Sequence, residues 1–587
     1  MNSRTAVMNE RFVTRSAGSS AAPVLTWRAT QGRSKLVLGL MMVGFLAIIV
    51  RAFILQHLDA ETWQSRAEKR FERVREVPAA RGKVLDRHGT VIASSVREEL
   101  LGIVPKQFNL SSSRVDQLAE IIGLSPQELR SRIRKANGFF YIARSLNLEQ
   151  ADKIRALRLP GIELEVEYRR HYPFGSAFAH AVGFTDSEDR GAEGLERIFE
   201  TALRGVPGVS RVIVDRQNEV VGQRAVSAPA HGTDLQLSFD AGIQTLVQSA
   251  LKTAMTEHRP RAASAVVVDV QTGEVLAMAS EPSFDPNNRA RLNPDLVRNR
   301  AVTDTFEPGS TLKPFSIAAA LELGRIRPST EITTDSGRMT IGNRTIGDTK
   351  QHGTLTVEGV LQKSSNVGTV KIAQKLSSEE LYNFYFASGF GKTPEGGIPG
   401  ATAGRLRPAQ RWVPIDHATI SYGHGVSVSL LQLARAYTAF ARDGDVVPLS
   451  FIKQTSPADS QRVMSPQTAQ AVRKMLQMAT EPGGTGPLAQ IPGFKVAGKT
   501  GTAYKPEKGG YAKDKYIASF AGFAPTDRPR FVIAVMVDEP SAGRHLAGEV
   551  AAPIFAQIAS DALRRLQISP DPSVRVLPAT VRIEEGT

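Results

Sequence analysis

The chain has 587 residues, of which 41% are hydrophobic and 22% are charged, and its formal net charge is +15. It contains no cysteine, which excludes disulfides, thiolate catalysis and cysteine-ligated metals. The positive charge fits a basic solvated surface, or attraction to anionic lipid or an acidic wall polymer. Nucleic acid is not expected as a partner, because zinc-finger spacing, an RNP string and long basic runs with interleaved aromatic residues are absent.

The N-terminal region predicts a membrane anchor. Residues 1–35 are polar and are expected to form a disordered cytoplasmic tail. Residues 36–55 form an apolar stretch interrupted by Arg51, and about 20 such residues are needed to cross a bilayer as a helix. A cleaved signal peptide is the alternative. It is disfavoured because a long segment precedes the stretch and no A-x-A site follows it.

Residues 56–233 are expected to form a mixed pedestal domain. Helical spacing of charged and apolar residues over residues 56–76 predicts a stalk that continues the anchor helix. Further expected elements are a strand–turn–strand over residues 81–93, a capped helix from Ser125 to Lys135 and a strand over residues 161–168. No cluster of catalytic residue types occurs here, so the pedestal is interpreted as a structural or docking module.

Residues 234–567 are expected to form an α+β domain. An apolar hairpin over residues 263–280, strands over residues 518–523 and 531–537, and a terminal helix over residues 551–566 predict a sheet packed with helices. Residues 568–587 contain prolines and little apolar periodicity, and are expected to be a disordered tail.

The segment FEPGSTLKPF places Ser310 at or beside the N-terminus of a predicted helix that Gly324 closes. Lys313 lies three residues later on the same helix face and can reach the Ser310 hydroxyl. Serine needs a partner to take its proton. A lysine that is desolvated or close to another cation loses its own proton more easily and can act as that base.

Two further strings complete the pattern S-x-x-K, S-x-N, K-T-G. Ser364 is a candidate to relay a proton between Lys313 and a leaving amine. Asn366 is expected to hydrogen-bond a substrate amide and to orient Lys313. Each string alone is weak, but their order and separations match a histidine-free serine acyl-transfer site.

The third string, in KTGTA, is expected to bind substrate. Lys499 and the Thr500 hydroxyl are suited to a carboxylate. Gly501 allows a substrate backbone to approach as an added strand. The backbone N–H groups of Ser310 and Thr502 are expected to form the oxyanion hole.

Residues 493–500 also match G-x-x-x-x-G-K-T, the phosphate-binding loop, which gives the competing hypothesis of a nucleotide-hydrolysing enzyme. Such a loop must open a helix, whereas loop-forming residues follow here. H-E-x-x-H and G-x-S-x-G are absent, and the histidines have no ligand spacing, so no metal site is expected.

Together these motifs resemble the class B penicillin-binding proteins, over residues 36–560. The resemblance rests on FEPGSTLKPF, LQKSSNVG, SYGHGVSVSLLQLARAY and KTGTA, with RGKVLDRHGTVIA and GAEGLE in the pedestal. Within the family the chain looks most like the FtsI-type septal D,D-transpeptidases of Gram-negative division. Ser365, where β-lactamases often carry aspartate, favours the transpeptidases.

The resemblance implies a transpeptidase fold with a β-lactamase-like sheet, acylation of Ser310 by D-Ala-D-Ala stem pentapeptides, and transfer to a neighbouring stem amine. It implies inhibition by β-lactams, no metal or organic cofactor, and a single inner-membrane span with the catalytic domain in the periplasm. It also implies an FtsW-type glycosyltransferase and other division proteins as partners.

Four alternatives remain at this stage. An elongation-type transpeptidase shares the three core motifs. A D,D-carboxypeptidase or β-lactamase would use the same serine, and product analysis separates it. A membrane-bound β-lactam sensor would be acylated without forming cross-links. A division scaffold would tolerate loss of Ser310.

Overall fold

The computed structural model describes residues 31–59, 61–63, 72–108, 113–214, 220–290, 292–457, 459–507, 509–572 and 574. The chain divides into two compact units, one containing residues 1–75 and 210–226 and the other residues 76–209 and 227–587.

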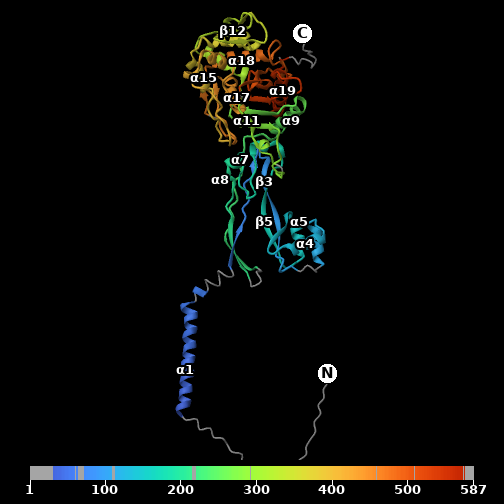
Figure 1. Ribbon diagram of the computed structural model, residues 1–587, viewed down its shortest axis with the longest axis vertical. Coiled ribbons are helices and arrows are strands. Elements are labelled where there is room, and N and C mark those ends of the chain that lie inside the picture. Colours follow the sequence, from blue (N-terminus) through green and yellow to red (C-terminus); the bar gives the residue numbers. More distant parts are fainter. Residues whose placement is uncertain are drawn as a thin grey trace, which may run out of the picture. The chain divides into compact units, whose positions relative to one another are not determined.

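The first unit contains a long apolar helix. α1 (Gln31–Phe53) continues into a short π-helix (Ile54–Leu58), and residues 32–58 are long and apolar enough to cross a membrane (Figure 1). Within the described part of the chain, none of its most apolar window is buried. The predicted span over residues 36–55 lies within this helix.

The predicted stalk helix is wrong at its C-terminal end. β1 (Glu72–Val77) is a strand, and it pairs in a three-stranded sheet of order β1-β6-β7 with β6 (Gly208–Val214) and β7 (Val220–Ser227). The two valines of ERVREV are three residues apart, which is a helical spacing. The partner strand comes from a segment more than 100 residues away, which local periodicity cannot reveal. Residues 60 and 64–71 of the predicted stalk lie outside the described residues.

The pedestal part of the second unit is built on one long strand. The predicted strand–turn–strand is confirmed as β2 (Val84–Leu85) and β3 (Val91–Ile103), joined by a turn in which Asp86 N–H donates to the Thr90 carbonyl at 2.8 Å. β3 pairs with β4 (Phe140–Leu146) and β5 (Ile162–His171), and β2 pairs with β8 (Leu235–Gln236).

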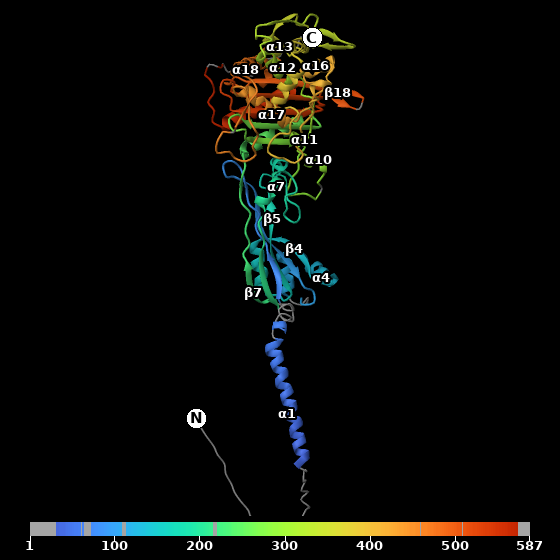
Figure 2. The same ribbon diagram turned by 90° about the vertical axis from the view of Figure 1, so that its left-hand side faces the viewer.

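Three helices cover this sheet, namely α3 (Arg114–Ile121), α4 (Pro126–Lys135) and α5 (Leu148–Ala156) (Figures 1 and 2). α4 has the predicted bounds, and the Ser125 hydroxyl caps it by accepting from Glu128 N–H at 3.2 Å. Buried Leu118, Leu129 and Ile154 share one apolar cluster with β3.

The two pedestal motifs of the sequence meet in a buried ion cluster. Glu196, in α7 (Gly194–Ile198), is fully buried, and its two carboxylate oxygens accept from Arg81 and Arg170 at 2.7 Å each. Glu200, in α8 (Glu200–Leu203), also accepts from Arg81 at 2.6 Å. Because each charge is paired inside the protein, removing one partner would leave a buried charge uncompensated.

The larger domain, which is the part of the second unit that follows the pedestal, is organised around a five-stranded antiparallel sheet. The strand order is β10-β9-β19-β18-β17. Its strands are β9 (Ala262–Asp269), β10 (Val275–Glu281), β17 (Ala497–Glu507), β18 (Gly510–Ala524) and β19 (Phe531–Asp538). The predicted hairpin and both predicted C-terminal strands are confirmed by β9–β10, β18 and β19.

Both faces of this sheet are buried, which explains its near-continuous apolar sequences. Ala265 and Val267 of β9 pack with α9 (Ala241–His258) and α19 (Ala547–Arg565), whereas Val266 and Val268 face a second core on the other side. That second core includes α12 (Lys313–Glu322), α17 (Leu430–Ala441) and α18 (Pro466–Thr480). The predicted α+β class is confirmed.

The remaining α-helices and short strand pairs complete the second unit, and several of them contribute fully buried side chains to its core. The helices are α6 (Ala179–Val182), α10 (Pro294–Val297), α11 (Arg300–Thr303), α13 (Val357–Lys363), α14 (Asn366–Ala373), α15 (Ser378–Ala387) and α16 (Pro414–Ser421). The short antiparallel strand pairs are β11 (Glu331–Thr333) with β14 (Thr354–Thr356), β12 (Arg338–Ile341) with β13 (Arg344–Gly347), and β15 (Asp445–Val446) with β16 (Gln461–Arg462). In the predicted tail, residues 573 and 575–587 lie outside the described residues.

Candidate active site

Ser310 lies in a tight 3₁₀ turn, Gly309–Leu312, that leads directly into α12. Its side chain is partly exposed, whereas Thr311, Leu312 and Lys313 behind it are fully buried. Among the described residues, the Ser310 hydroxyl has no hydrogen-bond partner. The turn therefore presents one free hydroxyl on a rigid base.

Neighbouring segments hold this turn in place. Gly309 N–H donates to the Gly423 carbonyl at 3.1 Å, and the Tyr437 hydroxyl donates to the Thr311 carbonyl at 2.7 Å. Gly423 has φ +91°, and a Cβ there would lie 2.1 Å from the Gly309 carbonyl oxygen. Only glycine fits at residue 423.

Lys313 is 0% exposed and points toward Ser364. Its Nζ donates to the Ser364 carbonyl and, at 3.2 Å, to the Ser364 hydroxyl. Burial, helped by the nearby Lys499 cation and opposed by Asp348, holds the pKa of Lys313 well below its usual range. The lowered pKa favours the neutral amine, which can accept a proton from serine.

Ser364 reaches Lys313 because the chain turns sharply between two helices. It is the C-cap of α13, with φ +60° in the left-handed region, and α14 begins two residues later. This conformation is uncommon for a residue other than glycine and is found at functional sites. The second motif therefore lies in the junction between two helices.

Asn366 starts α14, and its contacts differ in part from the expected ones. Its Nδ2 donates to the Gly347 carbonyl at 2.8 Å, and its N–H donates to Asp348 Oδ1. Among the described residues it makes no hydrogen bond to Lys313, so the expected direct orientation of Lys313 is not seen.

Asp348 was missed by the sequence reasoning. Its carboxylate accepts from the Ser365 hydroxyl at 2.6 Å and from the first N–H groups of α14, where a helix N-terminus favours negative charge. Asp348 also raises the pKa of Lys313, against the effect of burial. The sequence offered no signal for it, because the GDTK loop matches no motif and meets S-S-N only in three dimensions.

Lys499 is also 0% exposed and lies on β17, the edge strand of the sheet. Its Nζ donates to the hydroxyls of Thr485 and Thr500 at 3.3 Å each, and these two hydroxyls are 2.7 Å apart. Burial lowers the pKa of Lys499 to about 7. Thr485, outside every motif, was also missed.

Gly501 brings β17 against the nucleophile turn. A Cβ there would lie 2.6 Å from the Pro308 carbonyl oxygen and 2.9 Å from Thr311 Cγ2. The glycine is thus required by packing within the protein, in addition to the predicted approach of substrate. The next residue, Thr502, accepts at its hydroxyl from Ala547 N–H at 3.0 Å, which ties this part of β17 to the start of α19.

A third group beside the turn was not predicted. Glu307 accepts from Gly425 N–H at 2.8 Å and from the Tyr511 hydroxyl at 3.0 Å, and His424 Nδ1 lies 3.2 Å from it. Burial opposes the charged carboxylate, but these hydrogen bonds prevail and lower the pKa of Glu307. Tyr511 belongs to the β17–β18 hairpin, so Glu307 joins the hairpin to the turn that carries Ser310.

The structure rejects the phosphate-loop alternative. Residues 497–507 form the strand β17, which is buried at its start and exposed toward its end. The strand continues past Thr500, and no helix begins there. Lys499 is already engaged by two threonine hydroxyls.

Two family models match the chain. Residues 76–237 match the penicillin-binding protein dimerisation domain, and residues 263–560 match the penicillin-binding protein transpeptidase domain. The chain is also 42% identical, over 92% of its length and 94% of the relative's, to the probable peptidoglycan D,D-transpeptidase PenA of Neisseria gonorrhoeae. The chain belongs to the class B penicillin-binding proteins.

Other relatives agree with this assignment. Peptidoglycan D,D-transpeptidase FtsI of Escherichia coli is 37% identical over 94% of both chains. Among solved structures, the transpeptidase domain of Burkholderia pseudomallei penicillin-binding protein 3 is 47% identical and covers 57% of this chain and 97% of its own, with a TM-score of 0.53. Mycobacterium tuberculosis penicillin-binding protein 3, complexed with aztreonam, is 31% identical and covers 86% of this chain and all of its own, with a TM-score of 0.66. The boundaries 56–233 and 234–567 stay predictions beside these matches.

Proposed function

We propose that this penicillin-binding protein is a septal peptidoglycan D,D-transpeptidase that cross-links stem peptides through an acyl-enzyme on Ser310. One observation carries the proposal. A free serine hydroxyl, a buried lysine hydrogen-bonded to Ser364, and an edge strand carrying Lys499 lie in one place, although they come from three distant segments. The relatives named peptidoglycan D,D-transpeptidases support the same chemistry.

In the acylation step, Ser310 Oγ attacks the carbonyl carbon of the penultimate D-Ala. Its proton passes to Lys313, whose pKa is lowered by burial, or reaches it through the Ser364 hydroxyl. The carbonyl oxygen gains negative charge and is stabilised by the N–H groups of Ser310 and Thr502. The C–N bond then breaks, Ser364 delivers the proton to the leaving nitrogen, and D-Ala departs.

Substrate binding is assigned to the edge of β17. An extended peptide can add beside this strand with backbone hydrogen bonds, and the terminal carboxylate meets Lys499 and Thr500. Thr485 orients both groups through its hydroxyl. In the second step a stem amine, expected to belong to diaminopimelate, attacks the ester carbonyl. An amide forms, the ester bond breaks, and Ser310 regains its proton.

The location of the reaction is proposed from α1 together with the proposed chemistry. As a single membrane anchor it would hold the catalytic domain at the outer face of the inner membrane, in the periplasm where stem peptides are cross-linked. An FtsW-type glycosyltransferase and other division proteins are the proposed partners of the anchor and pedestal. The mechanism needs no cofactor, since every proton transfer is made by side chains of the chain.

Covalent labelling by a fluorescent penicillin tests the proposal. The wild type should form a stable adduct whose mass maps to Ser310, and Ser310→Ala should form none while keeping its melting temperature. Ser541→Ala, which alters an exposed serine, is the matched control and should label normally. An adduct on another residue, or labelling of Ser310→Ala, would overturn the assignment.

Product analysis then identifies the reaction class. Incubation with a stem pentapeptide and a diaminopimelate-containing acceptor should give cross-linked dimers and free D-Ala. Release of D-Ala without dimers would mark a carboxypeptidase.

Genetic complementation tests the septal role. The wild type should rescue the loss of a septal enzyme, which separates a septal role from an elongation role. Ser310→Ala should fail to rescue it, which separates an enzyme from a scaffold.

A further inference from the structure

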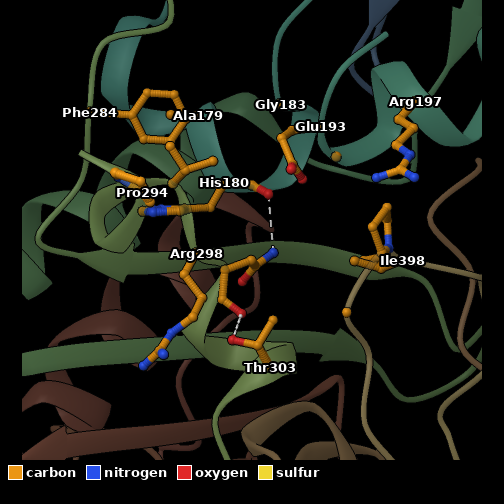
Figure 3. A pocket seen from close by; sticks show the side chains of 15 residues that line it. Ala179, His180, Gly183, Glu193, Arg197, Phe284, Pro294, Arg298, Thr303 and Ile398 are labelled. Atoms are coloured by element: carbon orange, nitrogen blue, oxygen red, sulfur yellow. Dashed lines mark hydrogen bonds between the residues drawn. The ribbon is translucent and has the colours of Figure 1, made fainter. Parts of the chain in front are cut away.

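A cavity of about 360 Å³ lies where the dimerisation module meets the transpeptidase domain, and none of its residues belongs to the catalytic motifs (Figure 3). One side comes from α6, α7 and the residues before α7, and the other from residues 284–303 and 398–400. Its size is at the small end of the range for ligand sites, about 300–1,000 Å³.

Asn299 supplies an unsatisfied acceptor in this cavity. The side chain is only 7% exposed. Its Nδ2 donates to the His180 carbonyl at 3.1 Å, and its backbone carbonyl accepts from the Thr303 hydroxyl at 3.0 Å. Its Oδ1 is buried and has no hydrogen-bond partner among the described residues. Buried polar atoms are rarely left unpaired, so this oxygen is suited to an N–H of a ligand.

Charges of both signs also line the cavity. Glu193 and Arg197 come from the α7 side, and neither side chain forms an ion pair or hydrogen bond within the described part of the chain (Figure 3). Arg298, on the opposite side, is paired with Asp304 at 3.0 Å. Burial lowers the pKa of His180 to about 4, so this histidine adds no positive charge at neutral pH.

The rest of the lining is apolar or small. Phe284 and Ile398 are buried, and Ala179 and Pro294 complete the wall. Such a wall suits a short aliphatic group. The free carboxylate of Glu193 suits an ammonium, and the free guanidinium of Arg197 suits a carboxylate on the same ligand.

We propose that this cavity binds an amino-acid head group, meaning an ammonium and a carboxylate on one carbon. The ammonium donates to Glu193 and to Asn299 Oδ1, and the carboxylate accepts from Arg197. A free amino acid and the free end of a short peptide share this chemistry. The site is separate from the Ser310 site, and the proposed reaction does not involve it.

Isothermal titration of the full-length protein in detergent tests the site. Prior acylation with benzylpenicillin occupies the Ser310 site, so that remaining binding belongs elsewhere. The probes are D-alanine and the tripeptide L-Ala-γ-D-Glu-meso-diaminopimelate, which distinguish a free amino acid from a peptide end. N-acetyl-D-alanine and D-alaninamide each lack one charge. At least one zwitterion should bind saturably. When D-alanine is that ligand, each blocked form should bind about tenfold more weakly, as expected for one lost charge-assisted hydrogen bond.

Variants locate the binding. Glu193→Gln and Arg197→Gln should each weaken the bound zwitterion about tenfold, whereas Arg204→Gln, an exposed arginine of the same module, should not. Absence of saturable binding by both zwitterions, or equal affinity in all three variants, would overturn the proposal. A failure of the proposed function would appear separately, as absence of benzylpenicillin acylation at Ser310.

Discussion

Lys313 and Lys499 are chemically identical side chains, both fully buried, yet the structure suits them to different tasks. Lys313 faces Ser364 and carries a strongly lowered pKa, which fits a base. Lys499 faces two threonine hydroxyls and has a pKa of about 7, so it is partly charged at neutral pH and fits a carboxylate partner. Their mutual repulsion contributes to the lowered pKa of Lys313.

A pH profile tests the assignment of Lys499. Below its pKa of about 7 it is a cation, and above that pH it loses the charge that attracts a carboxylate. The second-order rate constant for penicillin acylation should therefore decline on the alkaline side of neutrality. Arginine stays protonated across this range, so Lys499→Arg should lose the alkaline decline. Stopped-flow acylation from pH 6 to 9 measures both profiles. An unchanged decline in folded Lys499→Arg would contradict the assignment.

The same lysine makes stability depend on pH. Its pKa falls from 10.5 to about 7 on folding, so between these pH values the unfolded chain binds more protons than the folded one. Stability contributed by this group therefore rises with pH through this window and is lowest below it. Lys499→Met should reduce the rise. Melting temperatures of the two proteins at pH 7 and pH 9 measure it, and an identical increase in both would refute the prediction.

Thr485 is predicted to position the carboxylate-binding groups. Thr485→Val keeps the shape but removes the hydroxyl that holds Lys499 and Thr500. One lost hydrogen bond corresponds to about tenfold, so acylation by a carboxylate-bearing β-lactam should slow by about that factor. Thr253→Val, at an exposed helix position, should have no effect. Equal acylation rates in Thr485→Val and Thr253→Val would contradict this role of Thr485.

At the scale of elements, the nucleophile turn is fixed by close backbone approach. Gly309 contacts Gly423, and β17 contacts the turn at Gly501. The serine position thus depends on three segments whose proximity no local pattern predicts. The predicted stalk failed for the same reason, since β1 is a strand only because β6, which is distant in the sequence, pairs with it.

A matched glycine pair tests this packing. Gly423→Ala places a Cβ 2.1 Å from the Gly309 carbonyl oxygen, so the turn must shift. Misplacement of a reacting group by about 1 Å can cost about 10²-fold in rate, and acylation should fall by about that factor. Gly425→Ala shares the positive φ but meets no atom closer than 3.7 Å. It should retain most of the rate. A similar loss in both would assign the effect to backbone strain alone.

At the scale of the molecule, the absence of cysteine allows a clean test of membrane orientation. Ser541→Cys introduces a single thiol on the exposed surface of the catalytic domain. A maleimide that crosses the outer but not the inner membrane should label this residue in intact cells, because the domain is proposed to lie in the periplasm. Labelling only after lysis would contradict that orientation. A cysteine-free wild type is the control.

The sequence by itself determined the family, the α+β class, the apolar anchor and the motif residues. These properties depend on local pattern: apolar period, capping residues, and short strings with fixed chemistry. The roles predicted for Ser310, Lys313 and Lys499 stay predictions that the geometry supports.

Only the tertiary structure decided which residues surround the motifs. Asp348 and Thr485 lie outside the motifs. Glu307 lies in FEPGSTLKPF, but its role depends on Gly425 and Tyr511, which are distant in the chain. The direction in which each buried lysine's pKa moves, and the cavity beside Asn299, likewise exist only after folding. Burial and neighbouring charge set these properties, and both depend on segments that meet only in three dimensions.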